Sequence, residues 1–192
     1  MCRMKSAIIL KDRIFIPDYD SHTDMLKELG IEDTRANAER LFVRAELIPK
    51  NDDVFTPIDE WFFRVDQDIR PEWFVENYEK ERMINAVKEW AKDRIHIGID
   101  GLKINSGANH YIKDCKNVEV YGSASISKVC GSASISKAKG QSIIANSPNL
   151  VWRKQSGLIL SENATFKDNK AKVIYQSGGW ELRSVESEVT EE

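Results

Sequence analysis

The sequence has few cysteines and no long apolar run, and each absence excludes a class of protein. None of its three cysteines forms a CxxC pair, so we expect neither a disulfide framework nor a tetrahedral zinc set. No stretch approaches the roughly 18 apolar residues that a membrane-spanning helix needs. We therefore expect a cytoplasmic protein in a reducing compartment, with no membrane contact and no metal site.

A strong excess of one charge and the common phosphate-binding loops are also missing. The formal net charge is only −3, which excludes the strongly basic footprint of a protein that binds nucleic acid with its whole surface. Neither the GxxxxGK loop nor the GxGxxG loop occurs, so the usual means of holding nucleotide phosphates is not indicated. The sequence predicts no cofactor.

Residues 1–110 have the pattern of an α+β domain. Short apolar and β-branched runs predict strands in three stretches: 7–17, 41–49 and 60–68. Apolar residues at helical spacing predict one long helix over about 75–95, which would pack on antiparallel strands. The stretch HIGIDGLKI, at 96–104, predicts a hairpin because Asp-Gly is a preferred two-residue turn.

A nine-residue repeat marks residues 111–184. Two residue types recur nine positions apart: Gly122, Gly131 and Gly140, and Ile126, Ile135 and Ile144. Small and apolar residues alternate between them, which is the pattern of a strand. The repeat predicts a short-repeat β-solenoid, similar to a parallel β-helix, in which each unit supplies one strand and one corner. A small antiparallel meander or sandwich is the alternative, and the acidic segment 185–192 is expected to be disordered.

The repeat also resembles a known group of proteins. The stretch NVEVYGSASISKVCGSASISK, at 117–137, is similar to the short repeats with glycine, alanine and valine or isoleucine that end uncharacterised bacteriophage and mobile-element proteins. The resemblance implies the repeat architecture and a phage or prophage setting, but neither an activity nor site residues. The hexapeptide-repeat acyltransferases are more distant, because their coils need a six-residue period.

Four residues near the N-terminus are candidates for chemistry. Cys2 would become a terminal nucleophile if the initiator methionine were removed. Asp18, Asp20 and His22 lie in the stretch DYDSH, where they can bind a divalent metal or support acid–base catalysis. Asp and Ser also commonly cap helices, so a purely structural role is the alternative for these residues.

A second group of candidates lies between residues 60 and 75. Asp66 and Asp68 are one residue apart, a spacing that lets two carboxylates chelate from one face of a strand. Aromatic residues beside arginines can stack bases or hold a nucleotide, although core packing is their commoner use. The candidate binding residues are Trp61, Phe63, Arg64, Arg70 and Trp73.

Taken together, these features favour a non-enzymatic binding or assembly protein. Its repeat region would be a rigid scaffold or partner platform, and a protein partner or self-association is expected. In the phage setting that the resemblance implies, the partner would be a host or defence component. The alternatives are a small enzyme that uses Cys2, Asp18, Asp20 or His22, and a nucleic-acid or nucleotide binder that uses the aromatic and arginine residues.

Overall fold

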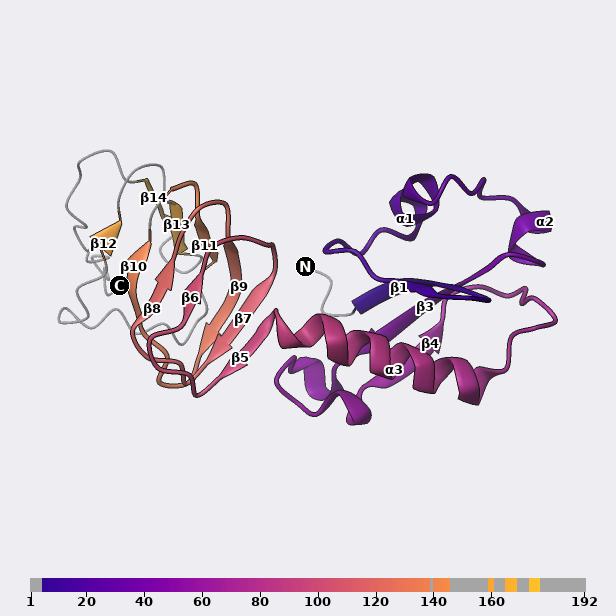
Figure 1. The fold of residues 1–192 in the computed structure, drawn as a ribbon, viewed down its shortest axis with the longest axis horizontal. Coiled ribbons are helices and arrows are strands. Elements are labelled where there is room, and N and C mark those ends of the chain that lie inside the picture. Colours follow the sequence, from indigo (N-terminus) through magenta and orange to yellow (C-terminus); the bar gives the residue numbers. More distant parts are fainter. Residues whose placement is uncertain (1–4, 139, 146–158, 161–164, 169–172, 177–192) are drawn as a thin grey trace, which may run out of the picture. The chain divides into compact units, whose positions relative to one another are not determined.

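The chain divides into two compact units, which are described separately. In the computed structural model (Figure 1), the described residues are 5–138, 140–145, 159–160, 165–168 and 173–176. The contacts separate Met1–Asp93 from Arg94–Glu192, whereas the sequence analysis expected the boundary near residue 110. Cys2 and the segment 185–192 lie outside the described residues.

The described residues of the first unit form one antiparallel sheet with the strand order β2-β1-β3-β4, of which β1, β3 and β4 are labelled in Figure 1. Its strands are β1 (Lys5–Leu10), β2 (Ile14–Phe15), β3 (Phe42–Ile48) and β4 (Phe62–Val65). Directly opposed residues point to the same face, so Ser6, Glu46 and Arg64 share one face. β1 and β3 are the central strands and are mostly buried.

Three α-helices and two short 3₁₀ turns are the other elements in the described part of this unit. The elements are α1 (His22–Glu28), α2 (Arg35–Ala38), η1 (Lys50–Asp52), η2 (Ile58–Glu60) and α3 (Glu76–Lys92). Ser21 begins α1 and its hydroxyl accepts a hydrogen bond from the Asp24 amide at 3.2 Å. The long helix predicted over about 75–95 is confirmed by α3.

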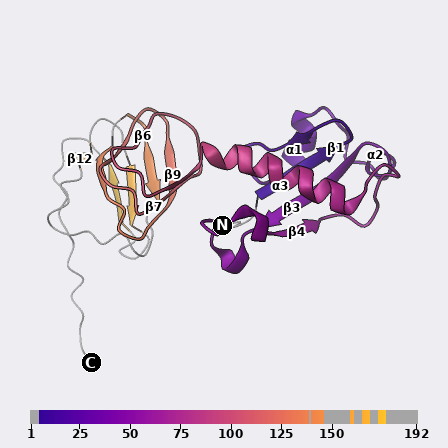
Figure 2. The ribbon, with the colours of Figure 1, turned by 60° about the horizontal axis from the view of Figure 1, so that its bottom comes forward.

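Apolar side chains join the helices of the first unit to its sheet. α1 and α2 pack on the sheet through one buried cluster: Ile8, Leu10, Met25, Leu26, Ala38 and Phe42. α3 lies along the sheet (Figure 2), contacts β1 and β2, and buries Met83, Val87 and Ala91. These three residues follow helical spacing, so one stripe of α3 supplies the buried face.

The described residues of the second unit form two sheets in which neighbouring strands run mostly parallel. One sheet has the order β12-β10-β8-β6 and the other β14-β13-β11-β9-β7-β5. The first sheet is made of β6 (Lys103–Ile104), β8 (Val118–Val120), β10 (Ile135–Ala138) and β12 (Ile159–Leu160). The second is made of β5 (Ile95–Ile97), β7 (His110–Lys113), β9 (Ser125–Cys130), β11 (Ile143–Ala145), β13 (Thr165–Asp168) and β14 (Val173–Gln176).

The chain alternates between these two sheets from β5 to β13, so consecutive strands do not pair with each other. Instead, Ile126 pairs with Ile144, and Val120 pairs with Ala138. Apolar residues from both sheets form one buried cluster: Ile104, Ile112, Cys115, Val118, Val120, Ala124, Ile126, Val129, Ile135, Ala138 and Ile144. This cluster holds the second unit together through burial of aliphatic surface.

The predicted fold class, an α+β domain followed by a β-solenoid over 111–184, is wrong. The described strands form three small sheets of mixed type, and no closed solenoid is present among the described residues. Parallel pairing already begins at β5, and β13 and β14 pair antiparallel. The physical reason is that the regular repeat covers only a few strands, so it does not determine how the flanking strands pair.

The predicted hairpin at 96–104 is also wrong. β5 and β6 belong to different sheets, where β5 pairs with β7 and β6 pairs with β8. Gly98 and Gly101, with φ of 68° and 70°, both adopt the left-handed conformation. Two such turns carry the chain from one sheet to the other, because glycine adopts positive φ at little steric cost.

No helix of the described residues combines the length and the apolar character needed to cross a membrane.

Candidate functional site

The structure divides the predicted aromatic and arginine group. Trp61 is only 3% exposed and its indole N–H donates to the Thr56 carbonyl at 3.0 Å, so it is a core residue. Arg64 donates through Nε to the Glu46 carboxylate at 2.7 Å. Phe63 is half-buried on β4. These three residues therefore do not form a common binding surface.

The other two predicted binding residues lie in the segment that leads into α3. The indole N–H of Trp73 donates to the Arg40 carbonyl at 2.8 Å, and its ring meets Phe74 edge to face with 6.4 Å between centroids. The Arg70 guanidinium lies 5.5 Å from the centre of the Phe74 ring and forms an ion pair with Glu76 at 2.6 Å. This segment therefore holds its aromatic rings in fixed positions.

Exposed apolar residues surround this segment. Val75 and Tyr78 are each 60% exposed and Leu41, which follows Arg40, is 42% exposed. Single exposed apolar residues are common on protein surfaces, but several of them together can mark an interaction surface. We name the group the helix-start surface and define it by six residues: Leu41, Arg70, Trp73, Phe74, Val75 and Tyr78.

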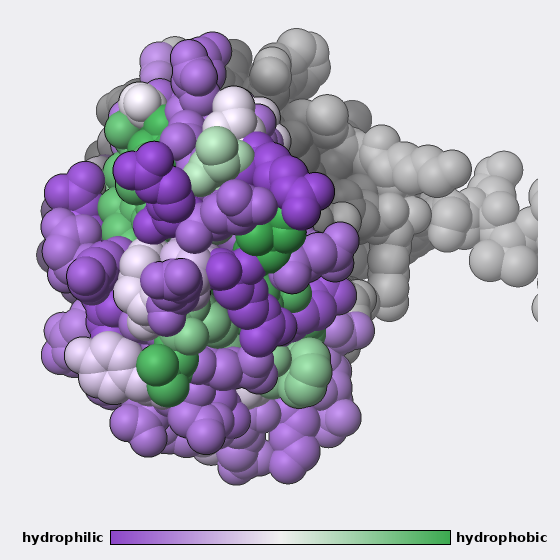
Figure 3. Space-filling model, turned by 90° about the vertical axis from the view of Figure 1, so that its right-hand side faces the viewer, coloured by the Kyte–Doolittle hydropathy of each residue, from purple (hydrophilic) through white to green (hydrophobic). Residues whose placement is uncertain are grey.

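Local chain geometry explains why these side chains remain exposed. Pro71 is buried, and its carbonyl accepts the Phe74 amide at 3.0 Å, which forms a turn before α3. Val75 occupies the N-cap position and offers no side-chain acceptor to the helix. Figure 3 faces this end of the first unit and shows apolar residues exposed in several places between hydrophilic ones. Scattered apolar residues of this kind are common on protein surfaces, so the helix-start surface is defined by the six named residues alone.

The acidic candidates Asp18 and Asp20 have structural partners. The Trp90 indole donates to Asp18 at 3.3 Å. Asp20 accepts the Ser6 amide at 3.3 Å and forms an ion pair with the buried Lys5, also at 3.3 Å. The Lys5 ammonium also donates to the backbone carbonyls of Pro17 and Tyr19, in the loop before α1. It lies 5.0 Å from the centre of the Trp90 ring. These contacts tie the loop before α1 to the sheet and to α3.

His22 is separated from this group and lies beside another candidate, Asp66. His22 Nδ1 is 3.4 Å from the Asp66 carboxylate, and Nε2 is 3.2 Å from the Ala45 carbonyl. Glu46, the third member of this group, was not predicted from the sequence, and its carboxylate lies with the other two ligand atoms within 4.8 Å of one another. No local signal marks it, because the pairing of β3 with β4 brings Glu46 to this face, directly opposite Arg64. A nitrogen and two carboxylates can hold a divalent metal or form a salt-bridge network.

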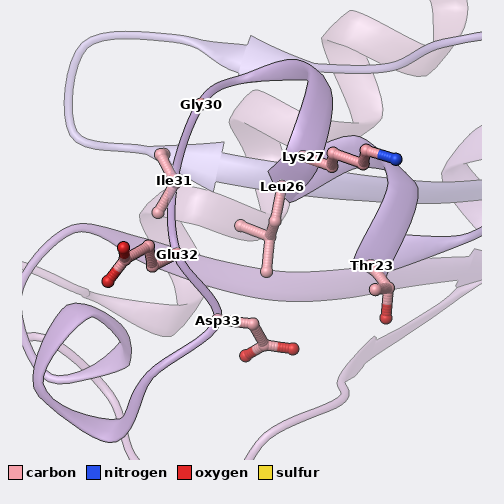
Figure 4. Close-up of a pocket in the computed structure, with 7 residues that line it drawn as sticks. All are labelled: Thr23, Leu26, Lys27, Gly30, Ile31, Glu32 and Asp33. Atoms are coloured by element: carbon pink, nitrogen blue, oxygen red, sulfur yellow. The ribbon is translucent and has the colours of Figure 1, made fainter.

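Two open pockets flank α1. One, of about 370 Å³, is shown in Figure 4 and is lined by Thr23, Leu26, Lys27, Gly30, Ile31, Glu32 and Asp33. The other, of about 500 Å³, is lined by Tyr19, Asp24, Lys27 and Glu28. In the second pocket the Tyr19 hydroxyl donates to Glu28, and this hydrogen bond raises the pKa of Tyr19 to about 12. Neither lining includes the predicted catalytic residues Asp20 or His22.

Comparisons with protein-family models, curated proteins and solved structures give no match to this chain. The resemblance to bacteriophage and mobile-element proteins therefore stays a prediction.

Proposed function

We propose that this chain is a non-enzymatic binding protein that recognises a protein partner through the helix-start surface. The observation that carries the proposal is the exposure of Val75 and Tyr78, at 60% each, in the stretch that directly follows Trp73. Aromatic residues and arginine are enriched at the centres of protein interfaces. Burial of such side chains against a partner removes apolar surface from water and stabilises the complex.

The pairing of the arginines favours a protein partner over nucleic acid. Arg70 forms an ion pair with Glu76, and Arg82, which lies 5.7 Å from the centre of the Tyr78 ring, forms an ion pair with Glu79. Binding of phosphate would have to compete with both carboxylates. An apolar patch whose charges are already paired is suited to a folded protein surface, where complementarity of shape counts more than net charge.

The contacts of the earlier catalytic candidates also favour binding over catalysis. Asp18 and Asp20 hold the loop before α1 in place through Trp90, Ser6 and Lys5. A role in structure accounts for both carboxylates without a reaction. In the setting that the sequence resemblance implies, the partner would be a host or defence protein, and the second unit would serve as a scaffold.

The proposal is tested by affinity purification of tagged chain from the cells that produce it. The double variant Val75→Asp, Tyr78→Ser changes two exposed residues, so we expect it to fold normally and to recover its principal partner at least tenfold less well. The matched control is Ile97→Asp, which changes an apolar residue of β5 that is 53% exposed. This control should recover the partner as the unmodified chain does.

Three outcomes would contradict the proposal. The first is equal recovery of the partner by all three chains. The second is loss of all associated material after nuclease treatment, which would favour the nucleic-acid alternative. The third is recovery of the chain alone, together with a monomeric mass in solution by light scattering, which would leave the surface without a protein partner.

A further inference from the structure

We propose that His22, Glu46 and Asp66 bind one divalent first-row transition-metal ion of the range from Mn²⁺ to Zn²⁺. This metal site is independent of the proposed protein-binding surface. Its three residues come from different parts of the first unit: the start of α1, the middle of β3 and the residue after β4. Their ligand atoms all lie within 4.8 Å of one another.

The groups around the His22 ring favour a positive charge at the imidazole, either a second proton or a bound metal ion. Nε2 is 3.2 Å from the Ala45 carbonyl and Nδ1 is 3.4 Å from the Asp66 carboxylate. A carbonyl and an ionised carboxylate only accept hydrogen bonds, whereas a neutral imidazole has a single N–H to donate. The side chain is only 10% exposed, so solvent has little access to the second nitrogen. A proton on each ring nitrogen, or a metal ion on Nδ1 with the N–H on Nε2, would satisfy both contacts.

The carboxylates favour the metal over the proton. Both contacts of Arg64 fall on one oxygen of Glu46, Oε2, which leaves Oε1 able to accept another bond. Glu46 is only 6% exposed, and Arg64 compensates its buried charge without using Oε1. A ring proton would satisfy only the contact between His22 and Asp66. A divalent ion would bind all three groups and leave Arg64 to position Glu46, as residues around metal ligands commonly do.

The spacing and the chemistry of the ligands indicate which ions fit. Bonds of about 2.0 to 2.2 Å place neighbouring ligand atoms about 3 to 3.5 Å apart. The pair His22 and Asp66 already has this separation, at 3.4 Å. Asp66 has a side chain that is 51% exposed and follows the end of β4, so it can move toward Glu46. One imidazole with two carboxylates suits these ions better than calcium or magnesium, which prefer oxygen ligands.

The experiment is calorimetric titration of the full chain with MnCl₂ and with ZnCl₂, after removal of bound metal by a chelator and dialysis. We expect one equivalent to bind, and Asp66→Asn and His22→Gln each to weaken binding at least tenfold. Two control variants should bind as the unmodified chain does. Asp33→Asn removes a carboxylate that is paired with Arg44, and His96→Gln removes one of two histidines that meet at 3.2 Å in the second unit.

Three results of this titration would overturn the proposal. They are the absence of binding at millimolar metal, binding by Asp66→Asn as tight as that of the unmodified chain, and loss of binding only in His96→Gln. A nitrogen NMR spectrum that shows both His22 ring nitrogens protonated at saturating Zn²⁺ would assign the positive species to a proton and would overturn it too. Thermal melting checks that each variant folds. If His22→Gln does not fold, Asp66→Asn decides, because that side chain is half-exposed.

Discussion

The carboxylate of Asp114 accepts two hydrogen bonds from Ser132, one from the backbone amide at 2.7 Å and one from the hydroxyl at 3.1 Å. Asp114 directly follows β7, and Ser132 follows β9 two residues after the strand ends. Since β7 and β9 are parallel neighbours, these bonds join the corners that follow two adjacent strands of one sheet. They hold the corners in register where no strand pairing does so.

The Asp114 bonds predict a dependence of stability on pH. The two bonds from Ser132 lower the pKa of Asp114 below its usual value. A group whose pKa is lower in the folded state stabilises the fold fully above its unfolded pKa, about 3.9 for Asp. This contribution is lost as the pH falls through the folded pKa. We therefore expect Asp114→Asn to reduce the free energy of unfolding clearly at pH 6 and much less at pH 2.5, as measured by urea unfolding.

The matched variant for this prediction is Ser132→Ala, which removes the hydroxyl donor and keeps the amide. It should change the free energy of unfolding in the same direction and by a smaller amount. A loss in Asp114→Asn that is equal at the two pH values would show that the charge of Asp114 does not contribute.

Gly122 lies close to the backbone of Asn105, so we expect any side chain at this position to reduce the free energy of unfolding. Its φ is +56°, and a Cβ atom added there would lie 2.4 Å from the Asn105 carbonyl oxygen, a backbone atom that cannot move aside alone. Gly98, with φ of +68°, has nothing within 4 Å of an added Cβ. We expect Gly98→Ala to cost about 1 kcal/mol from the backbone conformation alone, and Gly122→Ala to cost about 3 kcal/mol because a steric clash is added. Denaturant unfolding of both variants measures the difference, and equal losses would contradict this explanation.

The buried ion pair between Glu79 and Arg82 in α3 predicts that removal of the arginine costs more stability than removal of the glutamate's charge. Glu79 is 2% exposed, and Arg82 donates to both of its oxygens, at 3.1 and 2.8 Å. Arg82→Ala would leave a buried carboxylate without its counter-charge, which typically costs about 3 kcal/mol. Glu79→Gln keeps the shape and removes the buried charge, so we expect a loss of about 1 kcal/mol or less. Chemical denaturation at pH 7 compares the two variants.

The pH dependence of Arg82→Ala checks the cause of that loss. Burial raises the pKa of Glu79, while Arg82 acts to lower it, so removal of Arg82 should raise this pKa further. A carboxylate whose folded pKa is raised stabilises the fold most below its unfolded pKa, about 4.3 for Glu. That stability is lost as the pH rises through the folded value. Arg82→Ala should therefore regain stability relative to the unmodified chain between pH 7 and pH 4, and a constant deficit would assign the loss to packing.

Local patterns in the sequence predicted single elements better than their pairing. The apolar stripe of α3 and the alternation around Ile126 each determine an element through nearby residues, and α3 and β9 contain them. Pairing depends on residues far apart in sequence. The Asp100-Gly101 dipeptide is typical of hairpins, yet positive φ at both Gly98 and Gly101 sends the chain to the other sheet.

The candidate site was predictable in part. Trp61 and Trp73 have similar local sequences, but one is buried and the other lies at the helix-start surface, because burial depends on what packs against each ring. Glu46 lies in the stretch 41–49, which the sequence predicted as a strand without any role for this residue. It is buried because β3 is a central strand of its sheet, and this position is set by the strand order, which the local sequence does not reveal.

The measurement that tests the proposed function most directly is site-specific photocrosslinking in the cells that produce the protein. A photoreactive phenylalanine derivative replaces Tyr78 in one chain and Ile97 in a second, since both side chains are more than half exposed. We predict that the chain labelled at position 78 forms one abundant covalent adduct with a protein, and that the chain labelled at position 97 does not. The absence of an adduct at position 78, or the same set of adducts at both positions, would contradict the account.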